Sequence, residues 1–483
     1  MSRGALSQRL VLPIAAYAVL LVSGLQTLVV PVVGRIEADL HVSPTSAAWV
    51  VTANLLAAAV LTPVVGRLGD LRGRRSAMIA VLAVVVAGSV LAATTSSLPL
   101  LLVARVLQAS SFGLFPLSIG VLREELPPSR LTTAMALVSG MLAVGAGMGL
   151  VVTGLLMKGG GDYHALFWLS TALSLVGLAA VCVLPRRSSA TRGRIDWTGA
   201  ALLGLGLVLL LMPLEGGNSW GWGSRRVLGM LVAAGVVLAV FVLVERRVDE
   251  PLVTTRLLRH RQLGVANLAG LFFGLTLFVA FLGVSNFVQA PRGLAGYGFG
   301  ATVLAASLYL LPGSLAGVFT SPLAGRLVAR RGARLTLVLG TFFAIAGFAF
   351  LAAFHSMGWE IVAGSILVNT SVMFGYAAMP AIIVEHAAPS ETGIANSLNA
   401  IYRSVGMALG AAFVVTVLTR NPIEGLPVPL PHEEQFVVVF TVAAVLGCVF
   451  AALVWFGLPA RQPRVISRGR HAAQAATMEK ADH

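Results

Sequence analysis

Two arginines, Arg105 and Arg403, stand inside long apolar stretches of the sequence, and Gln108 follows Arg105 by three residues. A guanidinium placed in hydrocarbon costs several kcal/mol unless it faces a cavity or a polar partner. Such a residue is therefore either part of a functional site or a structural group bonded to backbone carbonyls. Both interpretations stay open on the sequence alone.

The 19 acidic residues are distributed differently, because none of them falls in the middle of an apolar stretch. Coupling a reaction to protons normally needs a group whose pKa can cross the working pH. Glu37, Asp39, Glu360 and Glu385 are alternates for that role, but we interpret them, like His355, as ordinary side chains at helix ends. Glu215, Glu245 and Asp196 also lie only near the ends of apolar stretches.

The composition indicates which elements must position these residues. Of the 483 residues, 57% are hydrophobic and 11% are charged, and the mean hydropathy is +0.89. Soluble domains carry about 25% charged residues, so these values exclude a soluble enzyme, a nucleic-acid-binding domain and a disordered chain. The two cysteines form no metal or redox spacing, and neither Lys158 nor Lys480 precedes Ser or Thr as in a P-loop. We expect no cofactor and no metal.

The apolar stretches predict an all-α polytopic membrane protein, because about 20 mostly apolar residues suffice to span a bilayer. A short loop at headgroup level, from Gly216 to Trp222, is expected between the seventh and eighth spans. The fourteen predicted spans are 10–33, 46–65, 76–95, 98–122, 131–157, 164–184, 196–214, 227–244, 263–288, 301–324, 335–355, 360–384, 393–419 and 436–458.

The basic residues predict an orientation. With an even number of spans, 26 of the 34 Lys and Arg residues lie on the side of the two termini and 6 on the opposite side. By the positive-inside rule, both termini are cytoplasmic. The net charge of +15 is then a topology signal and a contact with anionic lipid in the bilayer, and no nucleic-acid partner is expected.

An internal repeat divides the chain. Residues 66–75 recur at 325–334, an offset of 259, while Gly145 and Gly149 recur as Gly406 and Gly410 at an offset of 261. Parallel repeats of six spans are a transporter architecture with the substrate site near the midplane. The predicted parts are an N-terminal six-helix bundle (1–190), two extra helices with a cytoplasmic linker (191–258), a C-terminal six-helix bundle (259–460) and a disordered basic tail (461–483).

These motifs resemble the major facilitator superfamily, in particular its fourteen-span drug:proton antiporter branch. The resemblance implies that the loop after the second span latches the two halves in one alternating state, the alternative being a merely basic cytoplasmic turn. The loop residues that match the signature are Gly66, Gly69, Asp70, Arg72, Gly73, Arg74 and Arg75.

Two further motifs of that branch are present with departures. Arg105 and Gln108 match a pair that the family links to proton transfer. Gly145, Gly149 and Gly154 resemble its antiporter motif, although Leu150 replaces the usual proline and the motif could equally serve helix packing alone. The first span carries Gln26 where the branch usually has an aspartate.

Polar and aromatic residues within spans are candidates for lining a substrate cavity, with interhelical hydrogen bonding as the alternative for each. Met373 and Met379 suit adaptable recognition of apolar molecules. With no acidic residue expected in the cavity, we predict a small neutral, zwitterionic or weakly anionic amphiphile as substrate. The candidates are Gln26, Asn54, Gln108, Phe112, Asn286, Gln289, Tyr309, Asn369, Phe374, Tyr376, Asn399 and Arg403.

We therefore predict a monomeric secondary transporter in a bacterial plasma membrane, which exports small amphiphilic compounds by proton antiport through alternating access. The alternatives are a facilitator without proton coupling, an importer or a sensor of the same fold. A channel fits a duplicated, latched chain less well. A polytopic membrane enzyme would need a catalytic cluster, and no H-E-x-x-H or G-x-S-x-G motif occurs.

Overall fold

The computed structural model describes residues 3–42, 44–157, 161–185, 196–248, 257, 260–388, 391–423 and 430–458. Within these ranges the regular elements are helices, apart from an isolated bridge between Pro422 and Pro431. Fourteen of the described helical segments are long and apolar enough to cross a membrane. The predicted all-helical polytopic fold is confirmed, while the predicted basic tail at 461–483 lies outside the described residues.

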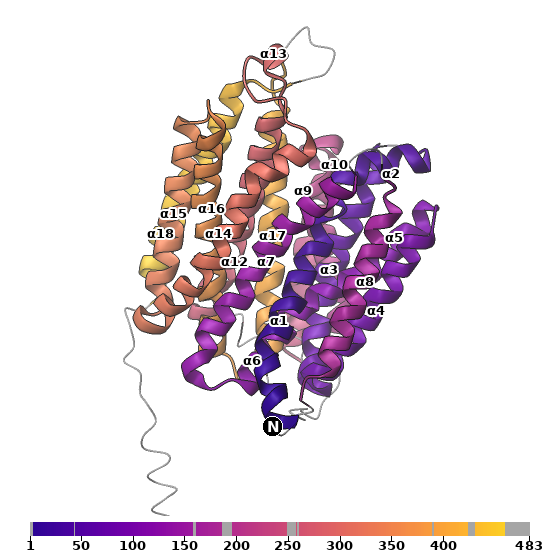
Figure 1. Cartoon of the computed structure of the whole chain (residues 1–483), viewed down its shortest axis with the longest axis vertical. Helices are drawn as coiled ribbons and strands as arrows, with labels where there is room; N and C mark the ends of the chain where they lie inside the picture. The colour runs from indigo at the N-terminus through magenta and orange to yellow at the C-terminus, as the bar shows by residue number, and fades with distance from the viewer. Residues whose placement is uncertain are drawn as a thin grey trace, which may run out of the picture.

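The N-terminal spans form one bundle, drawn in indigo to magenta in Figure 1. The first and fourth spans are each built from more than one helical piece. The elements are α1 (Arg3–Thr27), η1 (Val30–Val32), α2 (Val33–Leu40), α3 (Pro44–Arg72), α4 (Arg74–Thr94), α5 (Leu98–Ala109), η2 (Ser110–Gly113), α6 (Leu114–Glu125), α7 (Pro128–Leu156) and α8 (His164–Cys182).

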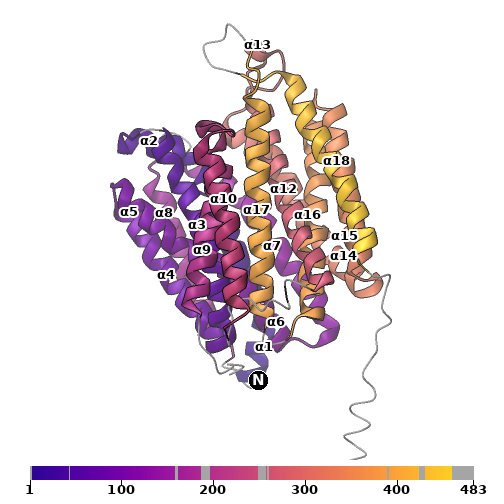
Figure 2. The same cartoon turned by 180° about the vertical axis from the view of Figure 1, so that it is seen from behind.

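The remaining helices comprise an inserted pair and a second bundle, which is coloured salmon to yellow in Figure 1. Helix α9 contacts both α3 and α17, and Figure 2 shows the inserted pair beside α17 on the back of the molecule. The elements are α9 (Trp197–Trp220), α10 (Arg225–Glu245), α12 (Arg261–Gln289), α13 (Arg292–Ala295), α14 (Val303–Arg331), α15 (Ala333–Ala353), α16 (Gly358–His386), α17 (Thr392–Leu418) and α18 (Glu433–Gly457).

The first span is less regular than the continuous helix expected over 10–33. Helix α1 ends at Thr27, and a 3-10 turn containing Pro31 leads into α2. Proline has no amide hydrogen and its ring clashes with the preceding helical turn, which explains the break. A left-handed residue, His41 with φ of 52°, ends α2.

The loop expected from Gly216 to Trp222 is shorter than predicted, because α9 continues to Trp220. Gly216 and Gly217 lie beneath the rings of Trp220 and Trp222, and an added Cβ would come within 3.0 and 2.8 Å of these rings. The turn begins at Gly221, whose φ of 82° favours glycine. Close packing of the tryptophans therefore keeps two glycines inside a helix.

The sequence repeat has a counterpart in the contacts. Gly73 and Gly332, which are 259 residues apart, both have positive φ, 87° and 90°, where α3 and α14 end. Two residues later, Arg75 donates a hydrogen bond to the carbonyl of Cys182 at 2.7 Å, and Arg334 donates to the carbonyl of Trp455 at 2.7 Å. Each arginine thus binds the carboxyl end of the last helix in its own bundle, where a cation is favoured.

Candidate functional site

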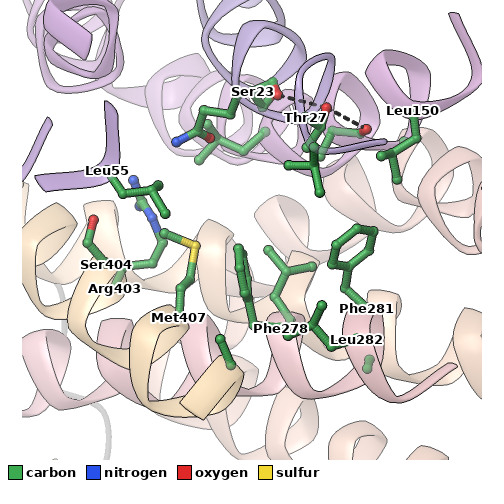
Figure 3. A pocket seen from close by; sticks show the side chains of 18 of the residues that line it. Ser23, Thr27, Leu55, Leu150, Phe278, Phe281, Leu282, Arg403, Ser404 and Met407 are labelled. Atoms are coloured by element: carbon green, nitrogen blue, oxygen red, sulfur yellow. Dashed lines mark hydrogen bonds between the residues drawn. The ribbon is translucent and has the colours of Figure 1, made fainter. Parts of the chain in front are cut away.

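A cavity of about 320 Å³ lies between the two bundles. Its wall comes from α1, η1, α3, η2, α6, α7 and α9 on one side and from α12, α14, α16 and α17 on the other, and it is largely aliphatic and aromatic. The polar lining residues are Ser23, Gln26, Thr27, Thr52, Ser314, Asn369, Tyr376, Arg403 and Ser404. Figure 3 shows Arg403 and Leu55 towards one side of this cavity and Phe281, Leu282 and Leu150 towards the other.

Arg403 is the one charged side chain among the described residues that line the cavity. It is 7% exposed, and its guanidinium carbon lies 5.1 Å from the ring centre of Phe115 and 5.3 Å from that of Tyr376. Both separations fall within the range of cation–π attraction. Phe115 and Tyr376 are 261 residues apart, the same offset as the repeated glycines, so the two bundles supply matching rings to one cation.

Five of the predicted cavity candidates lie in the wall, namely Gln26, Phe112, Asn369, Tyr376 and Arg403. Residues that the sequence analysis missed include Phe278, Phe281 and Met407. The first two are three residues apart in α12, and this one-face spacing of aromatic side chains was an available signal.

The other candidates lie outside the cavity wall, where each is satisfied or packed elsewhere. Asn54 donates to the carbonyl of Arg105 at 2.8 Å, and Asn399 donates to the carbonyl of Ala266 at 2.6 Å. Asn286 and Gln289 bond within α12, to Leu282 and Ser285. Tyr309 stacks on Phe299, Phe374 packs edge-on against Phe343, and Gln108 belongs to a separate polar network.

That network surrounds Arg105, which is 1% exposed. Its Nε donates to the carbonyl of Val50 at 2.9 Å, and its Nη1 donates to Oε1 of Gln108 at 2.7 Å. Gln108 in turn donates to Oγ of Ser89 at 2.8 Å. The arginine therefore ties α5 to α3 and α4 through neutral acceptors, as a structural group would.

Gly145 and Gly149 seat α7 closely against α1. An added Cβ at Gly149 would lie 2.8 Å from the carbonyl oxygen of Gly24. Thr27 of α1 donates to the carbonyl of Ala146 at 2.9 Å, and Thr153 donates to that of Leu28 at 2.8 Å.

The third glycine and the repeated pair make similar close contacts. Gly154 packs against Leu304 of α14, across the junction of the bundles. In the second bundle, Gly406 and Gly410 pack against the carbonyls of Leu271 and Leu275 of α12. The glycines therefore serve close helix packing in both halves.

Asp70, at the end of α3, contacts the other bundle. The amides of Gly393 and Ile394, in the first turn of α17, donate to its carboxylate. A helix amino terminus carries partial positive charge and free amide hydrogens, so it favours a buried carboxylate. Arg74 lies 3.3 Å from Asp70 and also pairs with Glu124.

The glycines around Asp70 permit this close approach. An added Cβ at Gly66 would lie 3.0 Å from the carbonyl oxygen of Gly393, and one at Gly69 would meet Leu117. Arg72 is exposed. We call Gly66, Asp70, Arg74 and Glu124, together with the amino end of α17, the latch.

More polar contacts join the bundles near the latch. Arg123 donates to Thr392 and to the carbonyl of Val384, the latter at 3.1 Å. Ser397 donates to the carbonyl of Thr62 at 3.1 Å. Ser321, which lies 259 residues after Thr62, makes the repeat-related contact. Its hydroxyl donates to the carbonyl of Ala136. The bundles are therefore joined along both α3–α17 and α7–α14 at the end where the chain begins (Figure 1).

Two of the four alternates for a titratable site have local roles. Asp39 pairs with Arg35 at 3.2 Å on the surface, and Glu360 accepts from the amide of Met357 at the start of α16. Among the described residues, no three His, Cys, Asp or Glu side chains gather as a metal site.

At the end opposite the latch, Tyr297 donates to the carbonyl of Pro431 at 2.7 Å, and burial raises its pKa to about 12.

Comparisons with known proteins agree with this architecture. The chain is 29% identical over 416 residues to the tetracenomycin C resistance and export protein of Streptomyces glaucescens, covering 84% of this chain and 75% of that protein. It is 25% identical over 403 residues to multidrug resistance protein 3 of Bacillus subtilis, covering 82% and 76%.

A solved structure shares the fold. The crystal structure of the human organic anion transporter MFSD10 (TETRAN) aligns with a TM-score of 0.64 at 16% identity, over 92% of this chain and 99% of that one. Residues 15–411 match the family described as the Major Facilitator Superfamily. The chain, with its fourteen membrane-length helices in two repeated bundles, therefore belongs to the Major Facilitator Superfamily of secondary transporters.

Proposed function

We propose that this transporter exports small amphiphilic compounds from a bacterial cell, acting as a monomer of the fourteen-span drug-exporter type. The observation that carries the proposal is the largely apolar cavity between the bundles, with Gln26, Asn369 and Arg403 among its polar lining residues. Such a wall accepts a hydrophobic body, while a few polar groups fix its orientation. The relatives named as a multidrug resistance protein and as a tetracenomycin C resistance and export protein support this assignment.

Alternating access would proceed by opening and closing the latch. The positive-inside rule assigns the latch end to the cytoplasm. Its contacts bridge the bundles, so we take this conformation as closed to the cytoplasm and committed to release on the outer side. Breaking the contacts of Asp70 and Arg123 with the other bundle would then let substrate enter from inside.

Proton exchange is the driving reaction of the branch that the motifs resemble. In this chain it would have to use groups outside the cavity, because the described lining residues include no carboxylate and no imidazole. Arg105 and Gln108 are its candidate relay. The same observation favours a second candidate, export without proton exchange.

The first test is susceptibility of an efflux-deficient bacterium that expresses the full chain, across a panel of amphiphilic antibiotics that includes tetracenomycin C. We expect resistance to at least one compound, and loss of that resistance in Asp70→Asn at an unchanged membrane level of the protein. Asp39→Asn, at an exposed pair, is the matched control. Equal susceptibility with and without the gene across the whole panel would refute export.

The second test uses purified protein in liposomes with an imposed pH gradient and a trapped pH-sensitive dye. Substrate-driven proton flux supports antiport. Movement of substrate with a silent proton signal supports export without proton exchange and removes the relay role of Arg105.

A further inference from the structure

The buried arginines of this chain differ in how their charge is satisfied. Arg105 donates to Val50 and Gln108, and Arg74 pairs with Asp70 and Glu124. Arg403 is more than nine-tenths buried, yet no carboxylate or other hydrogen-bond acceptor within the described ranges pairs with it. Within the described residues, the side-chain contacts recorded for its guanidinium are with the rings of Phe115 and Tyr376. A buried charge held by rings alone is costly, and an incoming acceptor would relieve that cost.

The position of Arg403 gives the cavity a charged end and an apolar end. Arg403 lies eleven residues from the amino end of α17, so at 1.5 Å per residue it is about 17 Å from the latch end. Phe281 lies twenty residues along α12, about 30 Å from the same end. Figure 3 shows the side chain of Arg403 extending towards Leu55, with Phe278, Phe281 and Met407 further along the cavity.

We propose that Arg403 makes the cavity selective for amphiphiles that carry a single negative charge, such as a carboxylate or phenolate joined to a planar apolar body. The acidic group would accept hydrogen bonds from the guanidinium, and the body would lie along Phe278 and Phe281. This inference rests on the proposed function only in taking the cavity as the substrate site.

The charge of Arg403 sets the order in which the cavity prefers ligands. A monoanion neutralises Arg403, whereas a dianion leaves one charge uncompensated in an apolar cavity and a cation is repelled. A hydrogen bond to a charged group is typically worth about tenfold to about a hundredfold in affinity. We therefore expect monoanions to bind more tightly than neutral analogues, and these more tightly than cations.

The test is equilibrium dialysis of the purified full-length protein, in neutral detergent near neutral pH, with three matched probes. These are 1-naphthoate, neutral 1-naphthamide and the cation 1-naphthylmethylammonium. The wild-type protein should bind naphthoate at least about tenfold more tightly than naphthamide. Equal affinities for these two probes, or tighter binding of the cation, would overturn the proposal.

Variants connect the preference to the residue. Arg403→Gln should lose the preference while still binding naphthamide, which shows that the cavity is intact. Arg403→Lys keeps the charge but not the forked geometry, so it should retain part of the preference for naphthoate. If the glutamine variant fails to fold, the affinity ratio of the lysine variant tests the proposal instead. Arg292→Gln, the same change at an exposed arginine outside the cavity wall, should leave the affinity ratio unchanged. A full preference in both Arg403 variants would also overturn the proposal.

Binding is measured without any gradient, so the two proposals can fail separately. A charge preference at Arg403 in a protein that confers no resistance would keep this inference and remove export. Export of neutral and anionic compounds alike, unaffected by Arg403→Gln, would keep export and remove this inference.

Discussion

Asp70→Asn should shift the protein away from the conformation closed at the latch. Asparagine keeps the size and one acceptor oxygen of the side chain but removes its charge. In the wild-type protein that charge faces the amides of Gly393 and Ile394 and lies 3.3 Å from Arg74, with the Asp70 side chain 1% exposed. The contact joins α3 to α17, so it is lost when the bundles separate at this end.

The size of the effect follows from the interaction of the carboxylate with the amino end of α17. A charge at a helix terminus contributes up to about 2 kcal/mol in partly buried geometry. Arg74 keeps Glu124 as its partner, so we add nothing for that pair. A loss of about 2 kcal/mol from the closed state alone changes the ratio of closed to open molecules by about thirty-fold.

Distances between two spin labels measure this ratio. Cysteines introduced at the exposed positions Ser76 on α4 and Ala388 after α16 place one label on each bundle near the latch, with Cys182 and Cys448 replaced by serine. We expect one short distance in the wild-type protein and an added longer distance in Asp70→Asn.

Asp39→Asn is the matched control, because Asp39 pairs with Arg35 at the same i,i+4 spacing and at 3.2 Å but on the surface. Exposed pairs contribute at most about 1 kcal/mol, and this one does not join the bundles. The reasoning is wrong if Asp70→Asn gives the wild-type distance distribution, or if Asp39→Asn changes it as much.

Three further predictions follow from single contacts. Gly66→Ala should reduce export and widen the distance between the labels, because its Cβ would lie 3.0 Å from a carbonyl of α17. Gly235→Ala in α10 is the control, because no atom lies within 4 Å of the added Cβ. It should change neither export nor the distance between the labels. Gln26→Asp places a carboxylate in the cavity that Arg403 lines. Equilibrium dialysis should then show a weaker preference for naphthoate and a stronger dependence of binding on pH. Unchanged binding would count against a cavity shared by the two residues. Tyr297 should ionise only near pH 12, compared with about 10 for a free phenol. Burial therefore favours the protonated phenol in the folded protein, and the stability that this gives below about pH 10 is lost as pH rises through about 12. The tyrosinate absorbance that Tyr297→Phe removes should be absent from the wild-type protein near pH 10 and appear near pH 12.

The sequence predicts the spans well because a helix in a bilayer must be apolar over most of its length. It also locates Arg105, Arg403 and the loop containing Asp70. Apolarity all round, however, hides which face of a helix meets the cavity. Asn54 and Asn399 are polar residues on the expected helices, yet both donate to carbonyls of neighbouring helices.

Contacts that depend on tertiary distance were the hardest to predict. The partners of Asp70 at Gly393 and Ile394 lie more than 300 residues away in the chain, and only the approach of two glycine-lined helices brings them together. The spacing of Phe278 and Phe281 places both rings on one face of α12, but it does not tell whether that face meets the cavity or the lipid. Their place in the cavity wall depends on how α12 is rotated against α17.

The positive charge that Arg403 brings to the cavity wall also has an electrical consequence. One elementary charge moving through 100 mV exchanges about 2.3 kcal/mol with the membrane potential, which corresponds to a concentration ratio of about fifty-fold. A monoanion that leaves a cell with a negative interior gains this energy on its way out. Arg403 stays with the protein and returns empty, so each turnover carries the charge of the substrate alone. The membrane voltage itself would then drive such a substrate outwards, even with equal pH on both sides.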